Sequence, residues 1–138
     1  MVLITDSNSN IISSSITVDK LMSMAYYSLS GSNSTNERFL AGADVYRKFI
    51  SFGALPNNTS KTMSTGITDA NYIWIDVANS LIFSSGSAYP LPYTDPSNNA
   101  NSVTVRITGN GQYITIQTGA NWSGYSAYIS LKYTKKTN

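Results

Sequence analysis

Two tyrosines and an aspartate in a proline-rich polar stretch form the first group of residues suited to ligand binding. The stretch covers residues 84–101 and contains Tyr89, Tyr93 and Asp95 beside three of the four prolines of the chain. Proline restrains the backbone, and tyrosine supplies a rigid ring with a polar tip, which suits stacking on a sugar ring or on a protein partner. We therefore predict these three residues as ligand-binding candidates. The structural alternative is that the Pro-Leu-Pro-Tyr run pins a long crossover to a sheet.

A second group lies in the glycine-containing segment 119–125, which reads GANWSGY. Trp122 and Tyr125 stand there beside Asn121 and Ser123. A flat apolar surface next to adaptable hydrogen-bonding groups is what carbohydrate or paratope-like recognition requires. We predict Asn121, Trp122 and Tyr125 as further ligand-binding candidates on an outward loop. The alternative is that Trp122 is buried in a contact between subunits.

Catalytic chemistry has little support in this sequence. The chain has no histidine and no cysteine, which removes most hydrolytic and thiolate-metal chemistry. Glycoside hydrolysis uses two carboxyl groups roughly 5 to 10 Å apart, and only Asp69, Asp76 and Asp95 would supply them in the strand-and-loop region. Asp69 and Asp95 stand beside Thr68 and Pro96, as is typical of turns. The sequence contains no spaced acidic loop of the calcium-binding type, so we predict no catalytic residue, no metal and no cofactor.

The composition is that of a polar, strand-rich domain. The chain has 138 residues, enough for one domain with a real core. Charged residues make up 12% of it, against about a quarter in an average domain. The net charge is +2, and three lysines of the C-terminal segment contribute to it, so we expect no nucleic-acid partner. The N-terminus does not have the pattern of a signal peptide, and no apolar run approaches the ~20 residues of a membrane span.

The first 35 residues differ from the rest in composition and in the spacing of their apolar residues. Apolar residues between 15 and 29 fall at helical spacing, with serines before them and Gly31 after them, which predicts one short helix. We expect this stripe to pack on the β-domain or on a neighbouring copy, or to dock on another protein. Residues 30–36 (SGSNSTN) have the composition of a loop or linker. Residues 1–35 are therefore predicted to be an anchor or oligomerisation segment with a short N-terminal helix or tether.

Residues 36–138 are predicted to form an all-β domain. Apolar residues alternate with period two, the signature of half-buried strands, at 45–52, 72–77, 102–108, 113–117 and 127–133, and a short apolar run follows at 81–83. The Gly-Asn-Gly step at 109–111 lies between two of these runs and predicts a hairpin. Since no helical crossovers separate the strands, we predict an antiparallel β-sandwich, jelly-roll-like in topology.

The order of several motifs resembles a known family. The segment 37–61, ERFLAGADVYRKFISFGALPNNTSK, is similar to the start of the C-terminal head domain of tailed-bacteriophage tail-fibre and other virion-surface fibre proteins. The resemblance continues through Pro-Leu-Pro-Tyr, the Gly-Asn-Gly hairpin and the closing YISLKYTK, and it covers about three quarters of the chain. The family commonly has a Trp-containing Asp-Gly-Lys turn where residues 40–44 here read LAGAD, so the role of that aromatic does not transfer.

The resemblance implies a non-enzymatic virion structural protein, a fibre head module located on the virion surface as a tail or capsid appendage. It also implies a homotrimer that contacts other virion structural proteins through the N-terminal segment and attaches to a host cell-surface glycan or protein, without membrane insertion. The alternative is a capsid or tail decoration protein that stabilises the particle and binds no receptor. The missing signal-peptide pattern disfavours a third interpretation, a secreted bacterial lectin.

Overall fold

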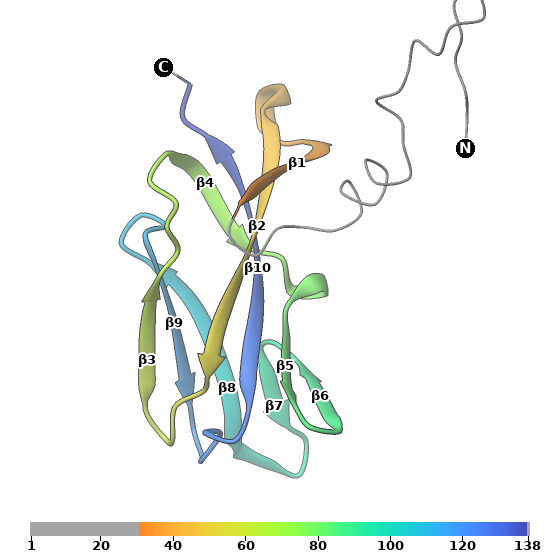
Figure 1. Cartoon of the computed structure of the whole chain (residues 1–138), viewed down its shortest axis with the longest axis vertical. Coiled ribbons are helices and arrows are strands. Elements are labelled where there is room, and N and C mark those ends of the chain that lie inside the picture. The colour runs from red at the N-terminus through yellow and green to blue at the C-terminus, as the bar shows by residue number, and fades with distance from the viewer. Residues whose placement is uncertain (1–30, 138) are drawn as a thin grey trace, which may run out of the picture.

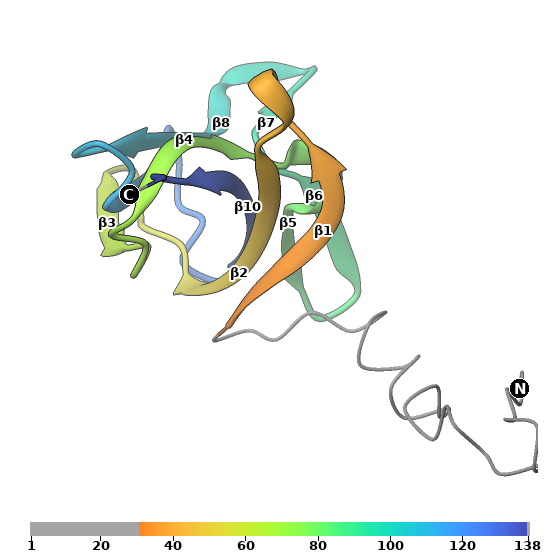
Figure 2. The same cartoon turned by 90° about the horizontal axis from the view of Figure 1, so that it is seen from above.

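The computed structural model describes residues 31–137, and they form two antiparallel β-sheets packed face to face (Figure 1; seen from above in Figure 2). The predicted all-β sandwich is confirmed. The helix predicted between residues 15 and 29, and most of the predicted anchor segment 1–35, lie outside the described residues.

The larger sheet has the order β1-β2-β10-β5-β6, with β4 also paired to β10, and the smaller sheet has the order β3-β9-β8-β7. The strands of the larger sheet are β1 (Ser32–Arg38), β2 (Asp44–Ala54), β4 (Ala70–Ile75), β5 (Leu81–Ser84), β6 (Ser87–Pro90) and β10 (Ser126–Lys135). Those of the smaller sheet are β3 (Ser60–Ser64), β7 (Tyr93–Asp95), β8 (Asn98–Thr108) and β9 (Tyr113–Thr118). Two short 3₁₀ turns, η1 (Leu40–Gly42) and η2 (Val77–Asn79), precede β2 and β5.

The core lies between the two sheets and follows from the alternation along the strands. On β10, every second residue points inward and is almost fully buried, as predicted: Ala127, Ile129, Leu131 and Tyr133. The smaller sheet contributes Val103, Ile114 and Ile116 from β8 and β9. Because successive side chains of a strand point to opposite faces, this spacing leaves one apolar face on each sheet to be buried against the other.

Two neighbouring connections, β2–β3 and β9–β10, join the two sheets. Consecutive strands β2 and β3 pair with β10 and β9, so both connections turn the same corner from one sheet to the other, as in a jelly roll. Backbone hydrogen bonds close the corner: the amide of Leu55 donates to Tyr125 (2.8 Å), and the amide of Asn58 donates to Ala120 (2.8 Å). In Figure 1 this corner lies at the lower end of the molecule, far from the C-terminus.

The predicted hairpin at 109–111 is confirmed, because β8 and β9 pair in register around it. Gly109, Asn110 and Gly111 all have positive φ values, of 61°, 54° and 89°, which glycine adopts without strain and asparagine tolerates. An added Cβ at Gly111 would lie 2.8 Å from a methyl group of Ile73. The residue types of this turn are therefore required by its geometry and by the close approach of β4.

Two predicted loops are wrong. Most of the predicted linker 30–36 is strand β1, which pairs with β2. The predicted long loop 84–101 contains β6, β7 and the start of β8, which form parts of two hairpins. Strand β3 was also not predicted. These strands are short or lie at sheet edges, where backbone hydrogen bonds form a ladder without requiring apolar alternation.

A buried ion pair lies in the larger sheet and was not predicted. Arg47 of β2 and Asp76, which follows β4, are 3.1 Å apart, and their side chains are only 10% and 8% exposed. The same oxygen of Asp76 accepts hydrogen bonds from the side chains of Asn79 (2.8 Å) and Ser130 (3.1 Å). The pair thus connects β2, β10 and the η2 turn, and Asp76 has a structural partner for its charge.

Candidate functional site

Four of the six predicted site residues come together in one group of rings. Tyr89 lies in β6, next to the crossover to the smaller sheet, and Tyr93 is the first residue of β7. Trp122 and Tyr125 lie in the corner between β9 and β10. The ring centroids of Tyr89 and Tyr93 are 4.8 Å apart, and those of Trp122 and Tyr125 are 4.9 Å apart. Tyr89 contacts both residues of the second pair, at 5.6 and 5.7 Å. We call Tyr89, Tyr93, Trp122 and Tyr125 the aromatic cluster.

The crossover between the sheets positions the two tyrosines of the first pair. The chain leaves the larger sheet at Pro90 and enters the smaller one at Tyr93, with a cis peptide bond between Leu91 and Pro92. Leu91 is fully buried in the core. The crossover is therefore pinned to the sandwich, as the structural alternative supposed, and the two rings flanking it are held next to each other.

Trp122 forms the buried base of the aromatic cluster. Its side chain is 4% exposed, so the prediction that it faces outward is wrong, and it is buried within its own domain. The rings of Tyr89 and Tyr93 meet it edge-on, at interplanar angles of 87° and 71°. The indole fills the space at the corner where β2–β3 and β9–β10 cross between sheets, and this requirement of packing determines its burial.

The three tyrosines are half-buried and form the outer layer of the cluster. The hydroxyl of Tyr89 donates a hydrogen bond to that of Tyr125, and this bond, together with repulsion from an ionised Tyr125, raises the pKa of Tyr89 above its ordinary value of 10.0. The phenol of Tyr89 is therefore neutral at physiological pH. The outer layer offers ring surface and hydroxyl groups that both donate and accept hydrogen bonds.

Asn121 and Asp95 use their polar atoms in local turns. The side-chain oxygen of Asn121 accepts hydrogen bonds from the amide (3.0 Å) and the hydroxyl (2.7 Å) of Ser123. The carboxylate of Asp95 accepts from the amide of Ser97 (2.8 Å) and the side chain of Asn101 (3.1 Å), and these bonds lower its pKa. Asp95 is thus a turn former between β7 and β8, while Asn121 is exposed and shapes the loop that carries Trp122.

Sequence reasoning missed a second feature of the surface, a hollow between the η1 turn and β4. It is lined by residues from three separate segments, among them Leu40, Asn71, Tyr72 and Thr137. The available signal was an exposed tyrosine on the polar side of an edge strand, but alternation alone does not show that η1 folds over this strand. Within residues 31–137, no group of three or more acidic, cysteine or histidine residues is arranged to hold a metal ion.

No family model matches the chain, and no curated protein and no solved structure is significantly similar to it. No helix among residues 31–137 is long and apolar enough to span a membrane.

Proposed function

We propose that this protein is the head module of a bacteriophage virion-surface fibre and that it attaches the particle to a host glycan through the aromatic cluster. The observation that carries the proposal is the convergence of Tyr89, Tyr93 and Tyr125 over the buried ring of Trp122. Two chain segments about thirty residues apart supply these rings.

The arrangement suits carbohydrate because it combines phenol hydroxyl groups with partly exposed ring surface. A sugar ring has apolar C–H faces that stack on aromatic rings and hydroxyl groups that exchange hydrogen bonds with tyrosine. The tyrosines pack against Trp122 and against each other, so binding immobilises few additional side chains. A rigid tyrosine surface is also the usual means by which antibody-like paratopes recognise polar ligands.

The resemblance to fibre heads concerns the framework rather than the cluster. Phe52 and Leu55 of the FGALPN motif are core residues, 0% and 3% exposed, and the closing YISLKYTK is most of β10. These residues support a relationship in fold. The attachment role is inferred from the cluster, and the virion context is inferred from the resemblance.

The test uses tyrosine variants, because removing the buried Trp122 would disturb the fold. We expect Tyr93→Ala combined with Tyr125→Ala to abolish binding of the soluble protein to purified host-surface polysaccharide, measured by biolayer interferometry. The same variant should no longer compete with phage for adsorption to cells. Tyr113→Ala is the matched control, because Tyr113 is a 45% exposed tyrosine of β9 that is not in the cluster.

Circular dichroism and thermal unfolding establish that each variant is folded. If the folded double variant binds and competes as well as the unaltered protein, the cluster does not bind the receptor. If the unaltered protein neither binds the polysaccharide nor competes with phage, and its deletion instead lowers particle stability, the decoration role replaces the attachment role.

A further inference from the structure

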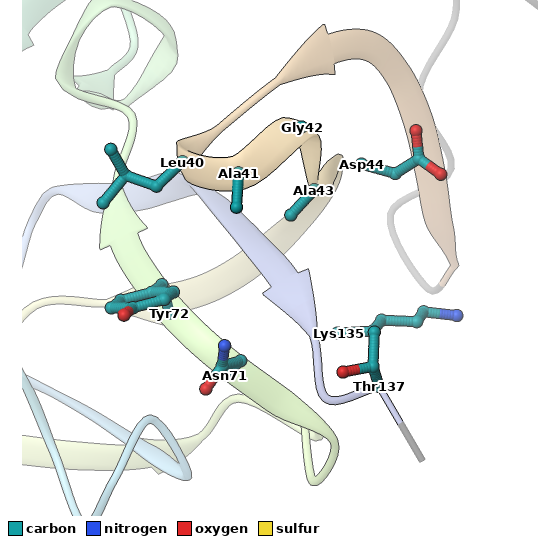
Figure 3. Close-up of a pocket in the computed structure, with 9 residues that line it drawn as sticks. All are labelled: Leu40, Ala41, Gly42, Ala43, Asp44, Asn71, Tyr72, Lys135 and Thr137. Carbon is teal, nitrogen blue, oxygen red and sulfur yellow. The ribbon is translucent and has the colours of Figure 1, made fainter.

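A hollow of about 520 Å³ lies between the η1 turn and β4, near the C-terminal end of β10. Figure 3 shows the turn above, with Ala41 and Ala43 pointing down, and the strand below, with Asn71 and Tyr72. Thr137 and Lys135 close the opposite end from Tyr72 (Figure 3). This volume falls in the range of ~300–1,000 Å³ that small-molecule sites occupy. In Figure 1 the turn between β1 and β2 and the start of β4 lie at the end of the molecule opposite the corner between β9 and β10.

Tyr72 provides an aromatic floor that is both exposed and fixed. Its side chain is 50% exposed, although its ring contacts Phe39 at 5.4 Å, and Phe39 in turn stacks on Trp74 at 4.9 Å. The backbone amide of Tyr72 donates to Thr134 of β10. Because its contact with Phe39 already restrains the Tyr72 ring, binding a ligand in the hollow would cost this side chain little additional conformational entropy.

The apolar wall and the polar groups stand on different sides. Leu40, 67% exposed, faces Tyr72 across one end of the hollow (Figure 3). Ala41 and Ala43 continue the apolar wall along the turn, while the amide of Asn71 points upward from the strand (Figure 3). The hydroxyl of Thr137 points into the space from the far end (Figure 3).

The charged residues at this end already have partners. Asp44 pairs with Arg38. The ammonium of Lys135 lies 4.0 Å from the carboxylate of Asp69 and 4.4 Å from the centre of the Tyr46 ring. A phosphate or a carboxylate ligand would need unpaired cations or backbone amides to compensate it. The hollow therefore suits a neutral ligand with one apolar face and several hydroxyl or amide groups.

We propose that this hollow is a second saccharide site, which takes a neutral N-acetylated hexosamine. The pyranose ring stacks on Tyr72, the acetamido methyl group packs against Leu40 and the alanines of η1, and the acetamido group exchanges a hydrogen bond with Asn71. A plain hexose leaves the apolar wall uncovered, and a purely apolar ligand leaves Asn71 and Thr137 unpaired. The site shares no residue with the aromatic cluster. Its proposal therefore does not depend on the attachment role proposed above.

The test is a titration of ¹⁵N-labelled protein with N-acetylglucosamine, followed by amide chemical-shift changes, with glucose as the ligand that lacks the acetamido group. We expect saturable changes at residues 40–44, 71–72 and 135–137, with millimolar affinity, and weaker changes with glucose. Tyr72→Ala should weaken binding about tenfold, as expected for loss of an aromatic stacking partner. Tyr113→Ala, which removes an equally exposed tyrosine outside the hollow, should leave binding unchanged.

Asn71→Ala is the second variant, for the case in which Tyr72→Ala alters the fold, and it should also weaken N-acetylglucosamine but not glucose. Amide dispersion of the free variants reports whether they are folded. The proposal is overturned if N-acetylglucosamine gives no saturable change at these residues, or if both variants bind it as the unaltered protein does. Changes confined to Tyr89, Tyr93 and Tyr125 would overturn this site and support the aromatic cluster instead.

Discussion

Trp122 and the tyrosines above it contribute in different ways, although all four are aromatic. Trp122 is 4% exposed, whereas the exposed Tyr113 leaves 45% of its surface in solvent. Removing a buried large aromatic side chain deletes its transfer free energy and leaves a cavity, at a cost of about 3–5 kcal/mol. Burial therefore separates Trp122, which holds the fold, from the half-buried tyrosines, which are the residues of the proposed attachment surface.

We accordingly predict that Trp122→Ala lowers the free energy of unfolding by about 3–5 kcal/mol, and that Tyr113→Ala lowers it by less than about 1 kcal/mol. Chemical denaturation followed by fluorescence of the remaining Trp74, or by circular dichroism, measures both. Equal losses for the two variants would contradict the assignment of Trp122 as the base of the cluster.

The hydroxyl pair of Tyr89 and Tyr125 predicts an alkaline titration. Because Tyr125 raises the pKa of Tyr89 in the folded protein, the stabilisation is fully present below the unfolded value of 10.0 and is lost as the pH rises through the folded pKa. Tyr125→Phe should move the titration of Tyr89 back toward 10.0, as measured by NMR of ¹³C-labelled tyrosine rings. Tyr113→Phe should not move it, and an unchanged Tyr89 titration in Tyr125→Phe would exclude the hydroxyl contact.

The pair of Arg47 and Asp76 predicts a contrast between buried and exposed charge. Asp76→Ala leaves the guanidinium of Arg47 buried without this carboxylate, at a cost of about 3–5 kcal/mol. Asp44→Ala breaks the pair with Arg38, in which both side chains are more than half exposed, and should cost at most about 1 kcal/mol. Urea denaturation of the two variants tests this, and a small loss for Asp76→Ala would show that Arg47 is satisfied by other groups.

At the scale of elements, the turn between β8 and β9 depends on Gly111. Its φ is +89°, and an added Cβ would approach Ile73 to 2.8 Å. Gly42 of η1 has a similar φ of +74° but open space around the position of a Cβ. We predict that Gly111→Ala lowers the free energy of unfolding by about 2–3 kcal/mol, from backbone strain plus a clash, and Gly42→Ala by about 1 kcal/mol, from strain alone.

Thermal or urea unfolding of both variants makes the comparison. If the two glycine substitutions cost the same, the contact between the hairpin and Ile73 of β4 does not constrain the turn, and backbone conformation alone accounts for the loss.

The elements predictable from sequence were those whose side chains alternate. β10 shows this most clearly, since its inward residues from Ala127 to Tyr133 were assigned to the correct face. The sequence predicts a linker in place of β1 because the polar side chains of this segment do not alternate with apolar ones, and the place of β1 in the sheet comes from backbone pairing with β2. The aromatic residues of the site could be identified from the sequence, but the extent to which each is buried could not. Whether Trp122 lies inside or outside depends on the corner between the sheets, which joins β2–β3 to β9–β10 from opposite parts of the chain.

At the scale of the whole molecule, the proposed fibre assembly requires several copies of the chain. We predict a homotrimer, because the fibre heads that this sequence resembles are the distal pieces of trimeric fibres. Light scattering coupled to size exclusion should give three times the 15.0 kDa of one chain, at concentrations diluted over two orders of magnitude. A persistent monomer would remove the trimeric fibre from the proposal and leave a solitary binding domain with its aromatic cluster.

The position of β10 in the centre of the larger sheet affects the order of folding as well as the stability of the fold. β2, β4 and β5 all take β10 as a partner, yet β10 is synthesised after all three of them. Long-range pairing of this kind requires most of the chain to be closed before its contacts form, which slows folding. Until residue 135 has emerged, β2, β4 and β5 lack their shared partner, so the larger sheet is completed only once β10 has been synthesised. We expect a chain arrested before residue 126 to be cleaved rapidly in a protease pulse, because its larger sheet lacks the central strand.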